Sequence, residues 1–284
     1  MMTIFTTPKP FVGDTRVRQI NALKSWKALH PDIEIIIFGD EEGTEDITSE
    51  LGLKHISNVE RNEFGTPLLN SMFSIAGEIG NYTIQAYINT DIVFIGDLRK
   101  VTEINRFKEF VVVGQRWDIY LTTLIDFCSP FWRELLLKSV KDLGSLHPPK
   151  GSDYFIFPRN TMSDMPPFAV GRTGWDNWVI YNCRRKHIPV INATNVITAI
   201  HLNHDYSHVK GNILDKENNN NIEMVGHLFY LYDANWIIEK NKLKRNYFGG
   251  GFIRTIRVFL IIHPELDLFR AILRWLRRTF NIKV

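Results

Sequence analysis

The stretch that decides the fold runs from Thr83 to Leu98 and reads TIQAYINTDIVFIGDL. An apolar run at residues 84–88 stops at Asn89-Thr90-Asp91, and a second apolar run begins at once with Ile92. Short runs rich in β-branched and aromatic residues are typical of buried strands. A carboxylate between two buried strands needs a partner, because an unpaired buried charge is costly. In open α/β sheets, ligands bind outside the carboxyl ends of the strands, which is where this carboxylate would lie. A cation that carries a phosphate-rich ligand would be a suitable partner for it.

Upstream of this stretch, short apolar runs alternate with segments of helical period. The simplest solution for such an alternation is a parallel sheet with right-handed crossovers. The sequence predicts strands at residues 3–7, 33–38, 55–57 and 84–88, and helices at residues 14–29, 44–51 and 68–79.

The second half of the chain is less regular. Four consecutive asparagines at residues 218–221, flanked by charged residues, indicate an exposed loop. The triplet Gly249-Gly250-Gly251 is the best candidate for a boundary before the C-terminal tail, which divides the chain into a domain of residues 1–245 and a tail of residues 246–284. Strands are predicted at 110–113, 154–157 and 189–191, and helices at 131–143 and 176–186.

Bulk composition excludes some classes of function. The net charge of +3 is uneven, because the tail has six arginines and one lysine against two acidic residues, which leaves a mildly acidic body. This distribution argues against nucleic acid as the main ligand. The two cysteines lack metal-site or redox spacing, so we expect free thiols in a reducing compartment. The N-terminus lacks a signal-peptide pattern, and no apolar stretch approaches a membrane span, so we expect a cytoplasmic protein.

A second constellation, GRTGWDNW, occupies residues 171–178. Its Asp176 falls where a first-turn residue of the next helix would lie, and a carboxylate at a helix N-terminus stays ionised. That property suits a base that deprotonates a sugar hydroxyl, with Trp175 and Trp178 as a wall on which an acceptor sugar stacks. The alternative is a capping aspartate between two core tryptophans, and the sequence leaves it open.

A third constellation, AIHLNHDYSH, occupies residues 199–208 and holds three of the nine histidines. Neutral imidazole is a common ligand for Mn-type or Zn-type cations. His201 directly follows an apolar run and is our first candidate ligand, with His204 the second. A dedicated zinc site is disfavoured, because neither cysteines nor an H-E-x-x-H pattern supports it.

Asn89-Thr90-Asp91 resembles the D-x-D element of glycosyltransferases with the GT-A fold, and the resemblance covers about residues 1 to 210. It implies an α/β fold with a mixed, mostly parallel sheet of Rossmann-like type flanked by helices. It also implies that Asp91 and a downstream histidine hold Mn2+ or Mg2+ on a nucleotide-diphosphate sugar, while Asp176 acts as the base. Asn89 stands where the family has an acidic residue, and we expect it to bind a ribose hydroxyl instead.

Several further polar residues fall at the expected carboxyl edge of the sheet. Asp153 comes at the entrance to a strand, where it could bind hydroxyls of the donor sugar, and Arg116 could contact phosphate in a bidentate manner. A fold of this kind usually holds the nucleoside at the ends of the first strands. The remaining donor-binding candidates are Thr6, Thr7, Asp40 and Asn70.

The tail contains a basic amphipathic pattern at residues 268–280, with four arginines on one helical face and apolar side chains on the other. A helix of this kind suits an anionic membrane surface. Docking on the body of the chain, or on a second subunit, is an equal alternative.

The function we infer from the sequence is a metal-dependent, inverting transfer of a sugar from a nucleotide-diphosphate sugar to a glycan or glycolipid hydroxyl, as in surface polysaccharide or glycolipid synthesis. The sequence leaves open a retaining enzyme, in which Asp176 or Asp153 faces the anomeric carbon. The alternatives are a non-catalytic carbohydrate- or membrane-binding module and a sugar nucleotidyltransferase. The latter normally needs a basic, glycine-rich loop near the first strand, which this chain lacks.

Overall fold

The alternating pattern of the first ninety residues forms four parallel strands in the order β3-β2-β1-β4. The computed structural model describes residues 1–96, 98, 101, 104, 106–203, 212–240, 242–266 and 275. The strands are β1 (Met2–Thr6), β2 (Ile33–Phe38), β3 (Lys54–Ile56) and β4 (Ile84–Ile88), and the helices between them are α1 (Gly13–Lys27), α2 (Thr44–Leu51) and α3 (Leu69–Ile79). The order reverses between β1 and β4, and ligands of open α/β sheets bind at the carboxyl ends of the strands beside such a switch point.

The second half of the chain extends this sheet on the other side of β4. Next to β4 lies β9 (Tyr154–Pro158), which is antiparallel to it and places its first residue opposite Ile88. Beyond β9 come β6 (Val111–Val113), β10 (Val190–Asn192), β12 (Trp236–Glu239) and β13 (Lys242–Arg245), with β13 antiparallel to β12. The mixed, mostly parallel α/β sheet that the sequence predicts is therefore confirmed, whereas β12 and β13 were not anticipated.

The second apolar run of the opening stretch does not continue the central sheet. It forms β5 (Ile92–Gly96), which belongs to a smaller sheet in the order β5-β11-β7-β8. Its other strands are β11 (Ile197–Leu202), β7 (Arg116–Ile119) and β8 (Ser145–Leu146). Residues 89–91 thus carry the chain from one sheet to the other, and this change of sheet is why a polar triplet interrupts two buried runs.

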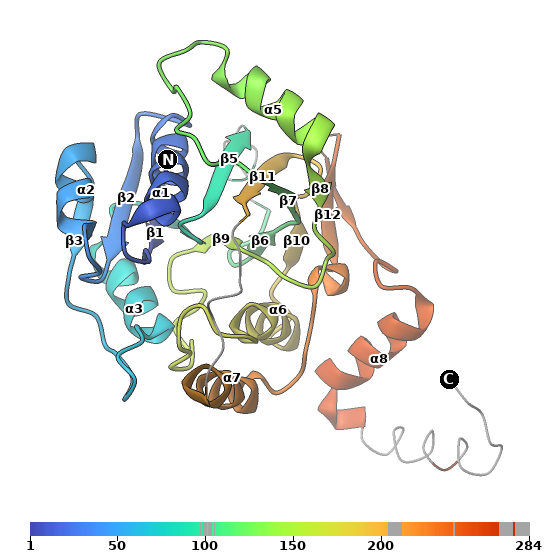
Figure 1. Cartoon of the computed structure of the whole chain (residues 1–284). Helices are drawn as coiled ribbons and strands as arrows, with labels where there is room; N and C mark the ends of the chain where they lie inside the picture. The colour runs from blue at the N-terminus through green and yellow to red at the C-terminus, as the bar shows by residue number, and fades with distance from the viewer. Residues whose placement is uncertain are drawn as a thin grey trace.

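The elements form layers that can be followed in Figure 1. One face of the central sheet packs against α3, α6 (Trp175–Arg185) and α8 (Phe252–Ile262) in a single apolar cluster. The opposite face packs against α1, α2 and the inner side of the small sheet. The outer side of the small sheet is covered by α5 (Trp132–Leu143). Successive residues of β1, such as Ile4 and Phe5, fall in different clusters, because neighbouring side chains of a strand point to opposite faces of the sheet.

The asparagine run is not a loop, contrary to our prediction. It lies in α7 (Asn212–Val225), where Glu217 and Asn221 are each 1% exposed. Asn221 accepts from the backbone nitrogen of Ala169 and donates to its oxygen, while Glu217 accepts from Arg172 at 2.7 Å. These tertiary hydrogen bonds outweigh the low helix propensity of asparagine.

The two cysteines are free thiols, with Cys128 exposed and Cys183 buried. Within the tail, α8 begins directly after Gly251, and its Val258 and Ile262 pack in the same cluster as α6. The division at residues 245 and 246 stays a prediction. The helix predicted at 268–280 lies outside the described residues except for Trp275. Within the described part of the chain, no helix is long and apolar enough to cross a membrane.

Candidate active site

The triplet that follows β4 is held at the switch point by two neighbouring strands. Asn89 donates from its backbone nitrogen to the oxygen of Asp153 and from its side-chain amide to Asp153 Oδ1, both at 2.9 Å. The Thr90 hydroxyl lies 2.9 Å from the hydroxyl of Thr6 and donates to the oxygen of Thr7 at 2.8 Å. Asp153 lies beside Asn89 because β9 runs antiparallel to β4, so its start meets the end of β4.

Asp91 faces His201 across the edge between the two sheets. His201 lies on β11, opposite Ile92 of β5, and its Nε2 is 3.5 Å from Asp91 Oδ2. Burial lowers the pKa of His201, but the hydrogen bond and the charge of Asp91 outweigh it and leave the pKa raised. The two predicted ligands thus lie side by side, and His204 lies outside the described residues.

Asp118, on β7, is the central carboxylate of the site and was missed by sequence reasoning. Its Oδ1 lies 2.9 Å from Arg116 Nε and 3.3 Å from His201 Nδ1, and its Oδ2 lies 2.7 Å from His147 Nδ1. Burial raises the pKa of Asp118, but the hydrogen bonds and charges of His147 and Arg116 lower it below its usual range. The side chain therefore holds three cationic or potentially cationic groups around one point.

Arg116 bridges the two carboxylates on either side of it. Its NH1 contacts Asp153 Oδ2 at 2.6 Å in addition to the contact with Asp118, and its side chain is 13% exposed. Burial lowers the pKa of Arg116, but the charge and hydrogen bond of Asp153 and those of Asp118 raise it, so the guanidinium stays charged. Both predicted donor residues, Arg116 and Asp153, thus reach the site already paired with each other.

Asp176 lies in the first turn of α6, after Gly174, whose φ of 107° is left-handed. Such a conformation favours glycine. The carboxylate accepts from the backbone nitrogen of Ser152 at 3.2 Å, next to Asp153. Burial, opposed by backbone hydrogen bonds and assisted by the charge of Asp153, raises the pKa of Asp176 to about 6. A carboxyl group with this pKa is mostly ionised at neutral pH and is still able to take up a proton.

Trp175 and Trp178 do not form the predicted stacking wall for an acceptor sugar, because each of them is buried and only 6% exposed. Trp175 packs edge-on against Tyr87 and Phe155, with ring centroids 5.1 and 5.2 Å apart, and Trp178 packs against Phe168 at 5.7 Å. Large aromatic surfaces at a helix–sheet contact stabilise the core, so neither ring offers a face to a sugar.

The residues predicted for the nucleoside lie at the ends of β1 and β2 and at the start of α3. Thr6 and Thr7 are buried, and Thr7 Oγ1 has no hydrogen-bond partner among the described residues. Asp40 is exposed and forms an ion pair with Arg61, a residue that the sequence did not single out. Asn70, in the first turn of α3, has a buried Oδ1 that lacks a hydrogen-bond partner within the described part of the chain.

The geometry of Asp91 and His201 fits a shared divalent cation. His201 Nδ1 lies 2.9 Å from Asn203 Oδ1, and when Nδ1 donates this bond, the Nε2 lone pair faces Asp91 Oδ2. With metal–ligand bonds of about 2.1 Å, a separation of 3.5 Å corresponds to an angle of about 110° at the ion, which tetrahedral or distorted octahedral coordination accepts. In the described residues, no group of three His, Cys, Asp or Glu side chains is arranged to hold a metal. Among the residues that the structure describes, Asp91 and His201 are thus the two candidate ligands.

Comparison with known proteins gives structural similarity only. No protein-family model and no curated protein matches the chain. Among solved structures it is similar to glucosyl-3-phosphoglycerate synthase of M. tuberculosis (12% identity, 78% of each chain, TM-score 0.46). It is also similar to mannosyltransferase PcManGT from Pyrobaculum calidifontis, solved with GDP-Man and Mn2+ (9% identity, 73% of this chain and 58% of that one, TM-score 0.46). For the galactosyltransferase LgtC the identity is 12%, the TM-score 0.34, and the shares 59% and 61%. Because these TM-scores lie below 0.5, the function must be argued from the site.

Proposed function

We propose that the chain is a glycosyltransferase that moves a sugar from a nucleotide-diphosphate sugar to a hydroxyl acceptor. One observation carries the proposal: the carboxylate of Asp176, whose pKa is raised to about 6, accepts from Ser152 beside Asp153, and Asp153 binds Asn89 next to the facing pair of Asp91 and His201. A general base works best with a pKa close to the working pH. A cation site and a base at one crevice are the two parts that such a transfer requires.

Asp91 and His201 would hold Mn2+ or Mg2+ in this site, and the diphosphate of the donor would complete the coordination. The bound ion would offset the negative charge that develops on the leaving nucleotide. Asn203 accepts from His201 Nδ1, and Asp118, held by Arg116 and His147, places its negative charge 3.3 Å from the same nitrogen. Partners of this kind fix the orientation of a ligating imidazole.

The nucleoside would occupy the crevice at the ends of β1 and β4. Thr7 Oγ1 is a buried hydroxyl with no partner among the described residues, so a base or ribose could satisfy it. Asn89, Thr6, Asp40 and Asn70 would supply the other polar contacts. Asn89 already donates to Asp153, which leaves its side-chain oxygen for a ribose hydroxyl.

Asp176 is the base in this proposal. It would take the proton of the acceptor hydroxyl, whose oxygen would then attack the anomeric carbon from the face opposite the leaving diphosphate, with inversion. Asp153 is less suited to a direct role, because Arg116 and Asn89 engage both of its oxygens. In a retaining enzyme Asp176 would face the anomeric carbon instead.

The acceptor would be a glycan or glycolipid, and the setting would be surface polysaccharide or glycolipid synthesis at the cytoplasmic side of a membrane. The basic helix predicted at 268–280 would bind the anionic membrane surface. Nucleic acid is not part of this proposal, because the basic residues gather in the tail rather than around the site.

The test is a panel of nucleotide sugars screened for Mn2+-dependent hydrolysis and transfer, with Asp91→Asn and Asp176→Asn as variants. An enzyme loses turnover in both variants, and Asp176→Asn keeps nucleotide-sugar binding. Asp142→Asn is the matched control, because Asp142 is exposed on α5. Binding of a sugar without turnover by the unaltered chain would favour the non-catalytic module, and release of pyrophosphate from a nucleoside triphosphate would favour the nucleotidyltransferase.

A further inference from the structure

The outward side of α8 exposes large apolar side chains. Phe252, Ile253, Ile256 and Phe259, which we call the α8 stripe, are 67%, 62%, 42% and 49% exposed. Residues 252, 256 and 259 have the i, i+4, i+7 spacing of one helical face. Tyr247 and Phe248, just before the helix, are also exposed. A contiguous apolar surface of this kind on a soluble domain marks an interaction site.

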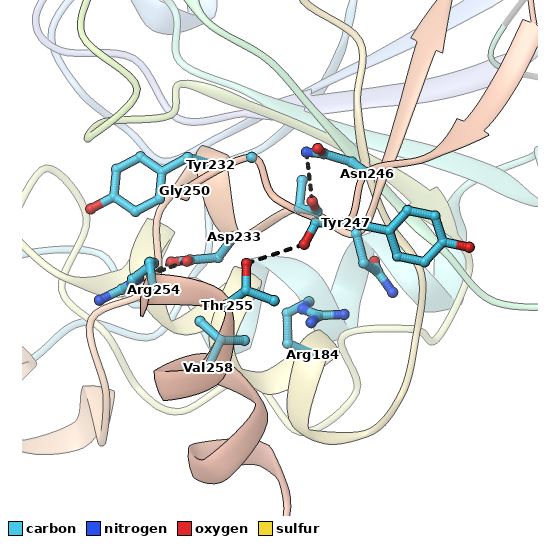
Figure 2. A pocket seen from close by; sticks show the side chains of 12 residues that line it. Arg184, Tyr232, Asp233, Asn246, Tyr247, Gly250, Arg254, Thr255 and Val258 are labelled. Atoms are coloured by element: carbon cyan, nitrogen blue, oxygen red, sulfur yellow. Dashed lines mark hydrogen bonds and ion pairs between the residues drawn. The ribbon is translucent and has the colours of Figure 1, made fainter. Parts of the chain in front are cut away.

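The opposite side of α8 fixes the helix on the body of the protein. Figure 2 shows Arg254 reaching Asp233, and the two contacts measure 2.8 and 2.6 Å. The Asp233 side chain is 1% exposed, so this ion pair is largely withdrawn from solvent. Val258 and Ile262 are buried in the cluster that contains α6. The stripe faces outward because a charged pair and two apolar side chains hold the other face.

The charge around the stripe is mostly positive, with Glu239 and Glu265 just outside residues 240–264. From Lys240 to Pro264 the sequence contains six lysine and arginine residues and no aspartate or glutamate. Arg257 is exposed on α8 itself, whereas Lys242 lies opposite Glu239 in the β12–β13 hairpin. By contrast, α5 also exposes leucines, but it carries Glu134 and Asp142 among its basic residues. Cations that border an aromatic and aliphatic stripe complement a surface that is apolar within and anionic at its rim.

We propose that the α8 stripe docks on an anionic phospholipid surface. The phenylalanines and isoleucines insert at the level of the headgroups, while Arg257 contacts lipid phosphates. Amphipathic helices with aromatic apolar faces and basic flanks bind at this interface. The surface is separate from the helix predicted at 268–280, and it does not depend on the proposed transferase chemistry. It holds the whole α/β body at the membrane through a rigidly attached helix.

The experiment is co-sedimentation of the full chain with vesicles of phosphatidylcholine alone, or of phosphatidylcholine and phosphatidylglycerol in equal parts. We expect binding to the anionic vesicles only. The variants Phe252→Ser/Phe259→Ser and Arg257→Glu should each lower the partition coefficient at least about tenfold. Leu135→Ser/Leu143→Ser on α5 is the matched control, since both leucines are exposed there, and it should bind as the unaltered chain does.

Several outcomes would overturn the proposal. Binding of both α8 variants at the original level would assign docking to another surface, including the segment at 268–280. Equal loss in the α5 control would show general apolar adhesion instead of a site on α8. A shift of the α8 variants from dimer to monomer in size-exclusion chromatography, with vesicle binding unchanged, would assign the stripe to a second copy of the chain. Because all the altered side chains are exposed, circular dichroism should confirm that the variants keep the fold.

Discussion

Replacing Asp176 by asparagine should make the protein more stable at neutral pH while it removes turnover. Burial, with the charge of Asp153 in support, raises the pKa of the Asp176 carboxyl from 3.8 to about 6. A shift of about 2 units corresponds to about 3 kcal/mol of free energy of unfolding. Asparagine keeps an oxygen that can accept from the backbone nitrogen of Ser152, so the change removes the charge with little change of shape.

The sign of the effect follows from the direction of the shift. The folded chain binds the Asp176 proton more tightly than the unfolded chain does, so protonation stabilises the fold. This contribution is fully present below the ordinary pKa of about 4 and is lost as the pH rises through about 6. In the variant the side chain at position 176 is neutral at every pH, so its free energy of unfolding does not fall in this way. We therefore expect it to exceed the unaltered protein by up to about 3 kcal/mol above pH 7, and to match it near pH 4.

The assay is urea unfolding of both proteins at several values between about pH 4 and about pH 8. Asp142→Asn, an exposed change on α5, should show no pH-dependent difference. A constant difference across the range, or a variant that is less stable at neutral pH, would refute the reasoning about burial. On the unaltered enzyme, the same titration should make kcat/KM fall as the pH drops below about 6, because the base becomes protonated.

Three further variants test separate contacts. Asn89→Asp restores the acidic residue of the D-x-D pattern, but it replaces an amide that donates to Asp153 with a carboxylate of like charge. Urea unfolding should therefore show a free energy of unfolding lower by about 1–2 kcal/mol. An equally stable variant would contradict this contact. Asp118→Asn should lower the affinity for Mn2+ about 10- to 100-fold, because His201 loses its charged partner. The affinity is measured without substrate by a titration followed by electron paramagnetic resonance. An unchanged affinity would count against His201 as a ligand. Arg184→Met should stabilise the protein by about 1 kcal/mol in thermal unfolding. The reason is that the buried Nε of Arg184 has no hydrogen-bond partner among the described residues. A less stable variant would show that this nitrogen has a partner.

The predicted part of the site consists of residues whose position follows from strand ends. Asp91 follows a buried run, and His201 lies near the end of another, so hydropathy alone indicated that both reach a sheet edge. Asp118 gave no such signal, because its partners His147 and His201 lie far away along the chain. The segment GQRWD at residues 114–118 contains a glycine and the candidate Arg116, but it matches no motif that assigns a role to its aspartate.

Two other outcomes depended on packing. Trp175 and Trp178 flank Asp176 in the sequence, and the sequence left open whether they face solvent or the core. The sheet decides this, because Tyr87 and Phe155 surround the ring of Trp175. The helix at the asparagine run is likewise stabilised by the hydrogen bonds of Asn221 with the backbone of Ala169. Helix propensity is a local property and does not predict these tertiary contacts.

The amino-acid sequence by itself determined the alternation of strands and helices up to Asn89, because apolar periodicity is a local property that each segment carries. It also determined that a polar triplet must interrupt two buried runs. Only the tertiary structure decided that these runs belong to different sheets, and that Asp91 meets His201 while Asp153 meets Asn89. These contacts join segments distant in the chain, and the direction of β9 and the pairing of β5 with β11, rather than any local preference, bring them together.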